Sequence, residues 1–248
     1  MSSSHNPMRY PSVLVLLCLA MALLMAGCSF PWQHPSAAMH NMPKPTTQQL
    51  LNAMRNSFRN VSAFHVVMRV QNAGRTTGSQ FQIRNADGDI IMPDKIKAQA
   101  TVILSGQSVT VNLVGIGRTE FITDPVTGQW RVINGAFDLR TLTSPDTGII
   151  SLLGKLQQLS APVDDAVNNI PCWRITGQMD AKYLAFLTGG GAPTGTLLQT
   201  SACIGKADSL LYQLSVTGQA AASYTAQTTL SFLLSNYNEH VSITAPQV

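Results

Sequence analysis

Charged residues and cysteines are both scarce in this chain. Asp, Glu, Lys and Arg make up 11% of its 248 residues, and only four residues are cysteine. The 16 Lys and Arg residues and the 12 Asp and Glu residues are scattered, so no segment carries a block of one charge. This pattern argues against a nucleic-acid groove, which needs a basic patch. A hydrophobic content of 45% also argues against a disordered chain.

Motifs for catalysis and for metal binding are missing as well. The sequence has no Gly-x-Ser-x-Gly elbow, no His-Glu-x-x-His motif and no phosphate loop ending in Gly-Lys-Ser/Thr. Asp164-Asp165 is the only pair of adjacent carboxylates, and it lacks further ligands for calcium. His34 and His40 share no spacing that would preorganise a site for a soft metal. We therefore expect no catalytic residue, no metal site and no cofactor.

An apolar run near the start of the chain ends at a cysteine. Arg9 precedes the hydrophobic run from Val13 to Ala26, and the small residues Ala26 and Gly27 lead into Cys28. A run of roughly 14 apolar residues suits a signal-peptide core, because a membrane-spanning helix needs about 20. The small-small-cysteine ending resembles the bacterial lipobox, although Met25 stands where the motif prefers Leu, Val or Ile.

The lipobox implies that the sulfur of Cys28 receives a diacylglyceryl group and that the chain is cut just before it. Residues 1–27 are then a lipoprotein signal peptide. Two acyl chains hold a protein stably on a bilayer where a single chain does not. The protein is thus expected on the extracytoplasmic face of the cell membrane, anchored by lipid. An uncleaved N-terminal anchor, or a plain cleavable signal followed by an incidental cysteine, is the alternative.

Residues 28–45 are expected to form a flexible tether, because they are rich in proline, histidine and serine and show no apolar periodicity. The remaining residues, 46–248, have the length of one all-β or α+β domain. Cys18 leaves with the signal peptide, so Cys172 and Cys203 remain as an even pair in an exported protein. This favours a disulfide between them. Two free buried thiols are the alternative, and neither cysteine has the His/Asn pattern of a catalytic thiol.

The domain begins with an amphipathic helix. Thr46 or Thr47 can cap a helix that ends near Asn60. A second helix is expected from about Thr147 to Leu159, apolar on more than one side, as either a lid on the sheet or an ordinary core helix. A third, short helix is expected at 180–187. The apolar residues of the first helix recur at helical spacing, and they are Leu50, Leu51, Met54 and Phe58.

Short alternating segments, separated by turn signals at intervals of about ten residues, predict consecutive antiparallel hairpins. The alternation of Ala98, Ala100, Val102 and Leu104 predicts a sheet with one apolar face and one polar face. Ala86-Asp87-Gly88 is read as a turn, and residues 161–165 as a loop. The expected strands are 63–71, 80–84, 89–92, 96–104, 108–114, 118–123, 129–132, 172–178, 198–204, 209–218 and 225–235.

The order of these pieces resembles the LppX/LprG-type lipoproteins of mycobacteria and their relatives. The resemblance covers nearly the whole mature chain. Besides Cys28 and the first helix, the segments that carry it are Ser62-Ala63-Phe64-His65, Gly88-Asp89-Ile90-Ile91-Met92-Pro93-Asp94-Lys95, Phe121-Ile122-Thr123-Asp124-Pro125-Val126-Thr127-Gly128-Gln129-Trp130, Ser235-Asn236-Tyr237-Asn238 and Ile243-Thr244-Ala245-Pro246.

This resemblance implies an α+β fold in which a strongly curved antiparallel sheet, a half-barrel like that of the periplasmic lipoprotein carriers, has helices packed on its concave face. It also implies that acyl chains of a lipid or glycolipid lie between sheet and helices and are carried in the cell envelope. The family does not require the Cys172/Cys203 pair, and its members differ in cavity size.

The expected function is therefore a non-enzymatic lipid carrier, a monomer with a lipid or glycolipid ligand and a possible transporter partner. The alternative is a surface lipoprotein with a structural or protein-binding role, whose concave face is simply core. A collapsed interior would favour that alternative. The residues expected to line a lipid cavity are Val102, Leu104, Val111, Leu113, Leu152, Leu153, Leu156, Leu214 and Phe232.

Overall fold

A computed structural model describes residues 44–74, 82–134, 148–188 and 191–248. Residues 44–248 form one compact unit, which is described here by itself. The predictions about the signal peptide, Cys28 and most of the tether fall on residues 1–43, outside the described residues. The expected start of the second helix, at Thr147, lies outside them as well.

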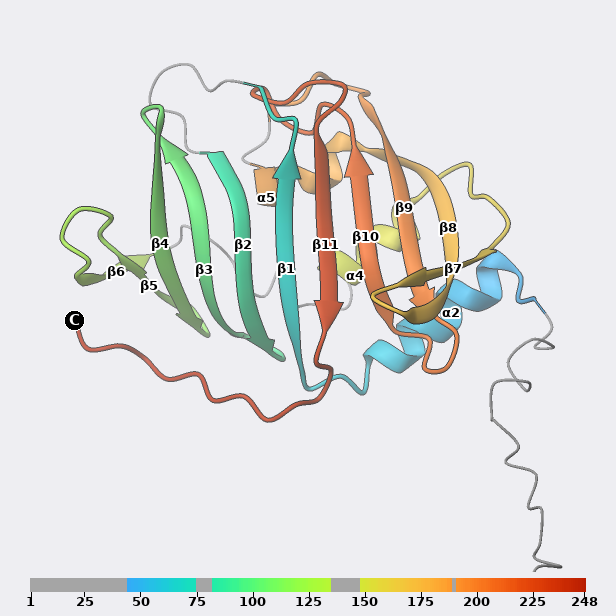
Figure 1. Ribbon diagram of the computed structural model, residues 1–248, viewed down its shortest axis with the longest axis horizontal. Coiled ribbons are helices and arrows are strands. Elements are labelled where there is room, and N and C mark those ends of the chain that lie inside the picture. Colours follow the sequence, from blue (N-terminus) through green and yellow to red (C-terminus); the bar gives the residue numbers. More distant parts are fainter. Residues whose placement is uncertain (1–43, 75–81, 135–147, 189–190) are drawn as a thin grey trace, which may run out of the picture. The chain divides into compact units, whose positions relative to one another are not determined.

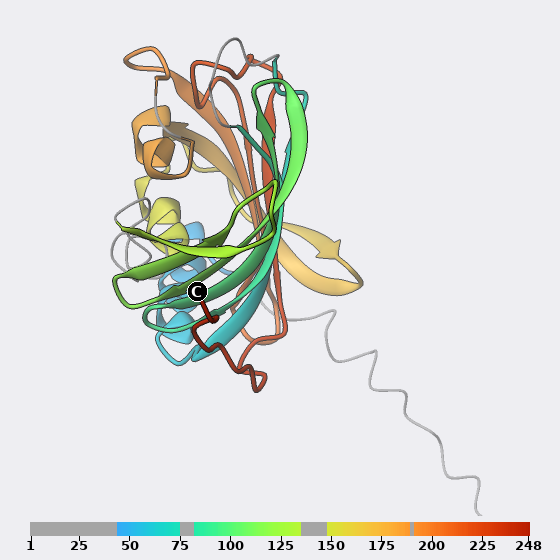
Figure 2. The ribbon, with the colours of Figure 1, turned by 90° about the vertical axis from the view of Figure 1, so that its left-hand side faces the viewer.

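The described residues build a large, open and strongly curved antiparallel sheet of 11 strands (Figures 1 and 2). The strands are β1 (Ala63–Gln71), β2 (Gln82–Ile91), β3 (Lys95–Leu104), β4 (Gln107–Ile116), β5 (Thr119–Thr123), β6 (Trp130–Asn134), β7 (Val163–Val167), β8 (Ile170–Asp180), β9 (Leu197–Gly205), β10 (Leu211–Thr217) and β11 (Thr229–Ser235). Their order is β6-β5-β4-β3-β2-β1-β11-β10-β9-β8-β7. In chain order, β1 to β6 extend from the centre of the sheet to one edge, and β7 to β11 extend from the opposite edge back to the centre. The last strand, β11, therefore pairs with the first, β1.

The helical segments lie on one side of the sheet (Figure 2). They are α2 (Thr47–Phe58), α4 (Ile149–Leu152), the 3-10 turn η2 (Leu153–Lys155), the 3-10 turn η3 (Ala181–Leu184) and α5 (Ala185–Thr188). The predicted first helix is confirmed as α2. Thr46 caps this helix through a capping box. The Thr46 hydroxyl accepts a hydrogen bond of 3.2 Å from the backbone N–H of Gln49, and the backbone N–H of Thr46 donates one of 2.9 Å to the side-chain oxygen of Gln49.

One face of the sheet is apolar from β4 to β8. Met68 on β1 stands opposite Ala86 of β2 and Phe232 of β11, and the same row continues through both halves of the sheet. This face, which we call the apolar face, packs with the buried side of α2 in one core. The opposite face, here the polar face, carries mainly hydrophilic side chains. The row on the apolar face consists of Val111, Ala100, Ala86, Met68, Phe232, Leu214, Ala202 and Ile175.

Most predicted strands are confirmed to within a few residues, but two predictions about turns are wrong. Residues 80–84 and 89–92 do not form separate strands, because β2 runs through Asp87-Gly88 without a turn and pairs with both neighbours. Residues 161–165 are not simply a loop, since β7 begins at Val163 and forms the edge of the sheet. Pairing with a neighbouring strand overrides the local turn signal in both places.

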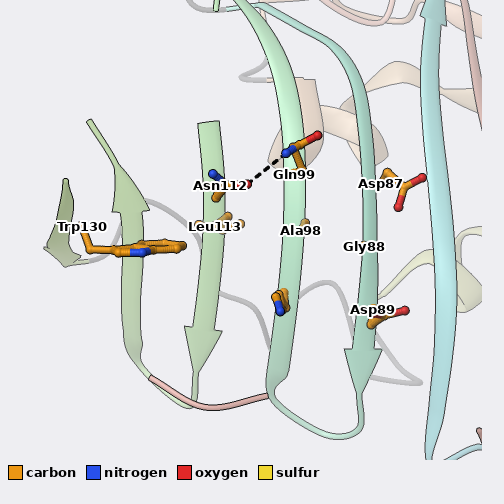
Figure 3. A pocket seen from close by; sticks show the side chains of 9 residues that line it. Asp87, Gly88, Asp89, Ala98, Gln99, Asn112, Leu113 and Trp130 are labelled. Carbon is orange, nitrogen blue, oxygen red and sulfur yellow. Dashed lines mark hydrogen bonds between the residues drawn. The ribbon is translucent and has the colours of Figure 1, made fainter. Parts of the chain in front are cut away.

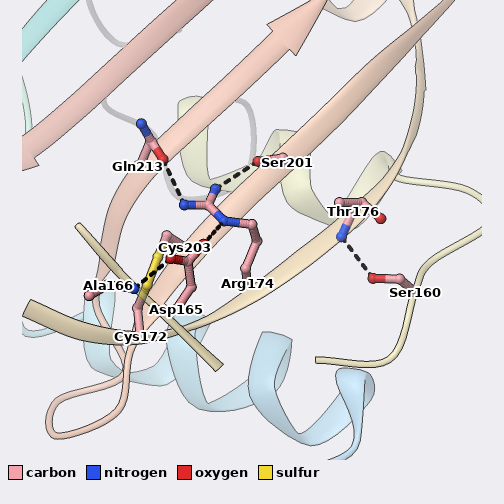
Figure 4. A network of polar contacts seen from close by, with 9 residues as sticks. All are labelled: Ser160, Asp165, Ala166, Cys172, Arg174, Thr176, Ser201, Cys203 and Gln213. Carbon is pink, nitrogen blue, oxygen red and sulfur yellow. Dashed lines mark hydrogen bonds and ion pairs between the residues drawn. A yellow bond between two sulfur atoms is a disulfide. The ribbon is translucent and has the colours of Figure 1, made fainter. Parts of the chain in front are cut away.

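The second helix is shorter than predicted. It ends at Lys155, because Leu156 adopts an extended conformation and the following residues pair with β8. The backbones of Gln157 and Gln178 exchange two hydrogen bonds of 2.8 Å. Three residues further on, the Thr176 amide donates to the Ser160 hydroxyl at 2.9 Å (Figure 4). These bonds to the sheet replace the helical hydrogen bonds that a longer helix would make.

Gly88 allows β2 and β3 to approach each other closely. A Cβ atom on Gly88 would lie 2.6 Å from the Ala98 Cβ and 2.6 Å from the Lys97 carbonyl oxygen. Both distances are far below van der Waals contact, and the carbonyl belongs to the backbone. Any side chain at position 88 would therefore push the two strands apart where the sheet curves.

We expect Gly88→Ala to lower the free energy of unfolding by about 2–3 kcal/mol, because the added methyl group overpacks the contact between two strands. Gly195→Ala is the matched control. Gly195 has a left-handed φ of 77° but nothing within 4 Å of its Cβ position, so its substitution costs only the backbone strain, about 1 kcal/mol. Urea denaturation measures both variants. Equal losses would contradict the close approach at Gly88.

Cys172 on β8 and Cys203 on β9 form the predicted disulfide, with their Cα atoms 5.6 Å apart (Figure 4). Both residues are fully buried, in a small cluster with Val167 of β7 and Leu233 of β11. The disulfide therefore links the paired strands β8 and β9, next to the edge strand β7.

Arg174 on β8 forms hydrogen bonds to three other strands beside the disulfide (Figure 4). Its guanidinium donates to the Asp165 carboxylate on β7, to the Ser201 hydroxyl on β9 at 2.9 Å and to the Gln213 amide oxygen on β10 at 3.1 Å. The hydrogen bond from Arg174, with a further one from the Ala166 amide, lowers the pKa of Asp165 below its ordinary value of 3.8. A lowered pKa in the folded state means that the ionised carboxylate stabilises the fold.

Asp165→Asn is expected to make the domain less stable at neutral pH and no less stable in strong acid. The stabilising contribution of Asp165 is present above pH 3.8 and disappears as the pH falls through the lowered pKa of the folded state. Urea midpoints at a series of pH values from 7 downward measure this difference. Gln213→Ala removes an uncharged partner of Arg174 and should cost the same at every pH. A loss for Asp165→Asn that does not depend on pH would contradict the role of its charge.

Candidate functional site

A partly open cavity lies on the apolar face of the sheet. Its volume is about 130 Å³, and the surface that it exposes is entirely apolar. Strands β1 to β5 and β11 form its floor, while Ile149 of α4 and Leu187 of α5 contribute from the helical side. Its lining residues are Val66, Met68, Ile83, Ala86, Asp87, Gly88, Ile90, Ile96, Ala98, Ala100, Val111, Leu113, Ile122, Ile149, Leu187 and Phe232.

Small side chains on β2 and β3 create this space. Ala86 and Gly88 on β2 face the same side as Ala98 and Ala100 on β3, and none of them extends beyond a methyl group. In the other half of the sheet, the same row carries the larger side chains of Leu214 and Ile175 on either side of Ala202, and all three residues are fully buried. The sheet is therefore tightly packed in one half and leaves a gap in the other.

Three of the residues predicted for the cavity line it, namely Val111, Leu113 and Phe232. Leu104 lies outside it and is 39% exposed, because it is the last residue of β3 before the turn at Ser105-Gly106. The other five predicted residues are buried but do not contribute to the cavity surface, and they are Val102, Leu152, Leu153, Leu156 and Leu214.

Several lining residues were missed from the sequence. Val66 and Met68 could have been found, since they share one side of the alternating strand 63–71. Ile149 could not, because the helix that carries it was predicted over a longer range and with several equivalent apolar positions. The small residues of β2 and β3 carry no signal of their own, since an alanine at a core position does not reveal whether its neighbours fill the gap.

Among the described residues that line the cavity, none offers a group inside it for acid–base or nucleophilic chemistry. The only charged residue among them is Asp87, whose side chain is 65% exposed on the polar face and lies 3.5 Å from the His65 ring. Within the described ranges, no cluster of three or more His, Cys, Asp or Glu side chains could hold a metal ion. No helix in the same part of the chain is long and apolar enough to span a bilayer. The surface of the cavity therefore suits a hydrocarbon.

Comparison with known protein families decides where the chain belongs. The model of the LppX_LprAFG lipoprotein family matches residues 46–243, which includes every strand of the sheet. The chain belongs to the LppX_LprAFG family. The resemblance inferred from the sequence is thus confirmed, and LppX_LprAFG members are lipoproteins of the cell envelope.

Two curated LppX_LprAFG relatives match the chain along nearly its full length. The lipoarabinomannan carrier protein LprG of Mycobacterium leprae is 23% identical over 253 residues, and the alignment covers 100% of both chains. The protein of the same name from Mycolicibacterium smegmatis is 24% identical over 246 residues, covering 95% of each chain.

Solved structures of LppX_LprAFG proteins share the fold. LprF of Mycobacterium bovis superposes with a TM-score of 0.63 at 18% identity, covering 82% of this chain and 99% of the other. LppX of Mycobacterium tuberculosis superposes with a TM-score of 0.56 at 19% identity, covering 80% of this chain and 100% of the other. At these identities the likeness shows the fold alone. The open curved sheet is therefore the family architecture.

Proposed function

We propose that this protein is a lipid carrier of the cell envelope, which binds an acyl chain of a lipid or glycolipid in the apolar cavity. The observation that carries the proposal is the wholly apolar surface of a cavity between the sheet and two helical segments. The LprG relatives, which are named lipoarabinomannan carrier proteins, support the same class of ligand. In this proposal the helical segments lie on the concave side of the sheet and cover the bound chain.

The size of the cavity limits the cargo. An engineered apolar cavity of about 150 Å³ in another protein stays dry and binds benzene, so a cavity of this order accepts a short hydrocarbon. The 130 Å³ found here holds a segment of one acyl chain. Each methylene transferred from water contributes about 0.8 kcal/mol, so even a few methylenes supply useful affinity. The rest of the lipid, with its headgroup, then lies outside the apolar lining.

The anchor completes the proposed function. Cys28 carries the diacylglyceryl group after residues 1–27 are removed, and residues 28–45 tether the domain to the extracytoplasmic face of the cell membrane. A monomer on such a tether exchanges its cargo with the membrane or with a transporter. Intact-mass analysis of protein purified from the membrane tests the anchor. The expected mature chain starts at a lipid-modified Cys28, whereas an intact N-terminus or an unmodified Cys28 would contradict it.

One observation favours a different function. The cavity volume of 130 Å³ is small for a protein that carries a large lipid, and a lipoprotein with a structural or protein-binding role needs no cavity. Native mass spectrometry and lipid extraction of residues 44–248, expressed in the cell envelope, separate the two functions. A carrier is expected to retain lipid in stoichiometric amount and to bind a fluorescent fatty acid after delipidation. A protein that retains no lipid and rejects the fatty acid would support the protein-binding role.

A further inference from the structure

A second cavity lies on the polar face, on the opposite side of the sheet from the apolar cavity. Its volume is about 330 Å³, at the small end of the roughly 300–1,000 Å³ typical of small-molecule sites. Strands β2, β3 and β4 form its floor, and Trp130 of β6 forms one wall. The Ala98 and Leu113 side chains line the apolar cavity, so at these two positions only the thickness of the sheet separates the two sites.

Three of the polar side chains that line this second cavity form one row across the sheet. Asp87 of β2 stands opposite Gln99 of β3, and Gln99 stands opposite Asn112 of β4. Beyond Asn112, the Thr123 hydroxyl on β5 accepts a hydrogen bond of 2.8 Å from the backbone N–H of Asn112. Thr123 in turn stands opposite Trp130 of β6. Figure 3 shows the Trp130 indole reaching across β5 toward the strand of Asn112 and Leu113. The sheet register thus places an aromatic ring, two amides and a carboxylate beside one hollow.

The two amides are already oriented. Gln99 donates from Nε2 to the Asn112 Oδ1 at 3.2 Å (Figure 3), which leaves the Gln99 oxygen as an acceptor and the Asn112 NH2 group as a donor. At the other end of the cavity, His65 lies 2.9 Å from Oδ1 of Asp89 and 3.5 Å from Oδ1 of Asp87. In each contact, His65 approaches only the Oδ1 atom of the carboxylate. The second oxygen of each carboxylate can accept from a ligand.

The Trp130 side chain is held in place by apolar contacts. It packs against a small apolar cluster on the polar face, formed by Val114 of β4, Phe121 of β5 and Ile243 of the C-terminal segment. This support fixes the indole at the edge of the cavity while part of the residue stays accessible. A fixed aromatic side chain presents its surface to a ligand at little cost in conformational entropy.

We propose that this second cavity binds a hexose ring of a neutral oligosaccharide. The C–H face of a pyranose packs on an indole, and its hydroxyl groups each donate and accept hydrogen bonds. The Gln99–Asn112 pair offers both a donor and an acceptor to these hydroxyl groups, and the neighbouring carboxylates accept from them. Lys97 of β3 also lines the cavity, but the two carboxylates of Asp87 and Asp89 outnumber its single ammonium group. The lining therefore opposes phosphates, uronic acids and other anions by charge. This saccharide site goes beyond the proposed carrier function and does not depend on it, because the acyl chain is bound on the other face of the sheet.

The test is fluorine NMR of the full chain labelled with 5-fluorotryptophan, in a detergent without a sugar headgroup. The chain has three tryptophans, so each gives a separate signal that a Trp→Phe variant assigns. Titration with maltotriose, cellotriose and mannotriose is expected to shift the Trp130 signal for at least one of them, with a Kd of about 1 mM or tighter. The signal of Trp173, which is 7% exposed, should stay in place.

Variants of the floor keep the proposal falsifiable if a Trp130 variant does not fold. Gln99→Ala and Asn112→Ala should each weaken the saccharide about three- to tenfold, the effect of one lost hydrogen bond. Gln213→Ala, an amide on the same face outside the cavity, should bind like the parent chain. No saturable shift of the Trp130 signal with any of the three sugars, or an equal effect of all three amide variants, would overturn the proposal. A response to adenosine in place of the sugars would also overturn it.

Discussion

Replacing Val111 with tryptophan is expected to weaken acyl-chain binding about tenfold or more while the domain stays folded. Val111 lines the apolar cavity from β4 and is 6% exposed, so the indole must occupy the 130 Å³ that the acyl chain would fill. Excluding only two methylenes costs about 1.6 kcal/mol, which is more than tenfold in affinity.

Fluorescent fatty-acid titration measures the effect, and circular dichroism checks the fold. Val132→Trp is the matched control, because it places the same ring on β6 at a position that is 44% exposed and outside the cavity. Ile122→Trp is a second cavity variant, at a lining position on β5 that is only partly buried. Folded cavity variants that bind fatty acid as well as the control would show that the ligand lies elsewhere.

Removal of the disulfide is expected to lower the free energy of unfolding by about 3–4 kcal/mol. Cys172 and Cys203 are 31 residues apart in sequence, so the bond removes much of the loop entropy of the unfolded chain. The loop between them includes η3, α5 and Leu187, one of the cavity lining residues. The bond therefore closes the segment that contributes Leu187 to the lining of the apolar cavity.

Urea denaturation of the oxidised protein, the reduced protein and the double variant Cys172→Ala, Cys203→Ala measures this contribution. The reduced protein and the double variant should unfold at similar, lower urea concentrations, and a reducing agent should not affect the variant. Cys28→Ala leaves the pair intact and should respond to the reducing agent like the parent chain. Oxidised and reduced proteins of equal stability would contradict a stabilising role for the bond.

Local sequence signals predicted the elements of this fold better than their extent. The capping box at Thr46 and Gln49 and the alternation in 63–71 act within a few residues, and both predictions are confirmed. The Asp87-Gly88 dipeptide has the composition of a turn, yet it lies in the middle of β2 because Gly88 is needed for close contact with β3. Such a contact depends on a partner strand, which a local pattern does not reveal.

The cavity was predictable in kind but not in position. Alternation identified the apolar face, and that face carries Val111 and Phe232 in the row that crosses the cavity. Whether a residue on this face lines a cavity or fills the core depends on the size of its neighbours across strands. Leu214 stands opposite Phe232, a residue that lines the cavity, but Leu214 itself is fully buried in the core. The polar-face row ending at Trp130 depends on the register of five strands, which the sequence alone does not fix.

Diffraction from crystals grown with a fatty acid brominated near the middle of its chain tests the central claim most directly. The anomalous signal of bromine locates one atom of the ligand without reference to the rest of the map. We expect a bromine peak in the apolar cavity, between Phe232 on β11 and Ile149 on α4. A peak on the polar face or at the sheet edge, or a cavity without a peak in crystals of a protein that binds the fatty acid in solution, would contradict it.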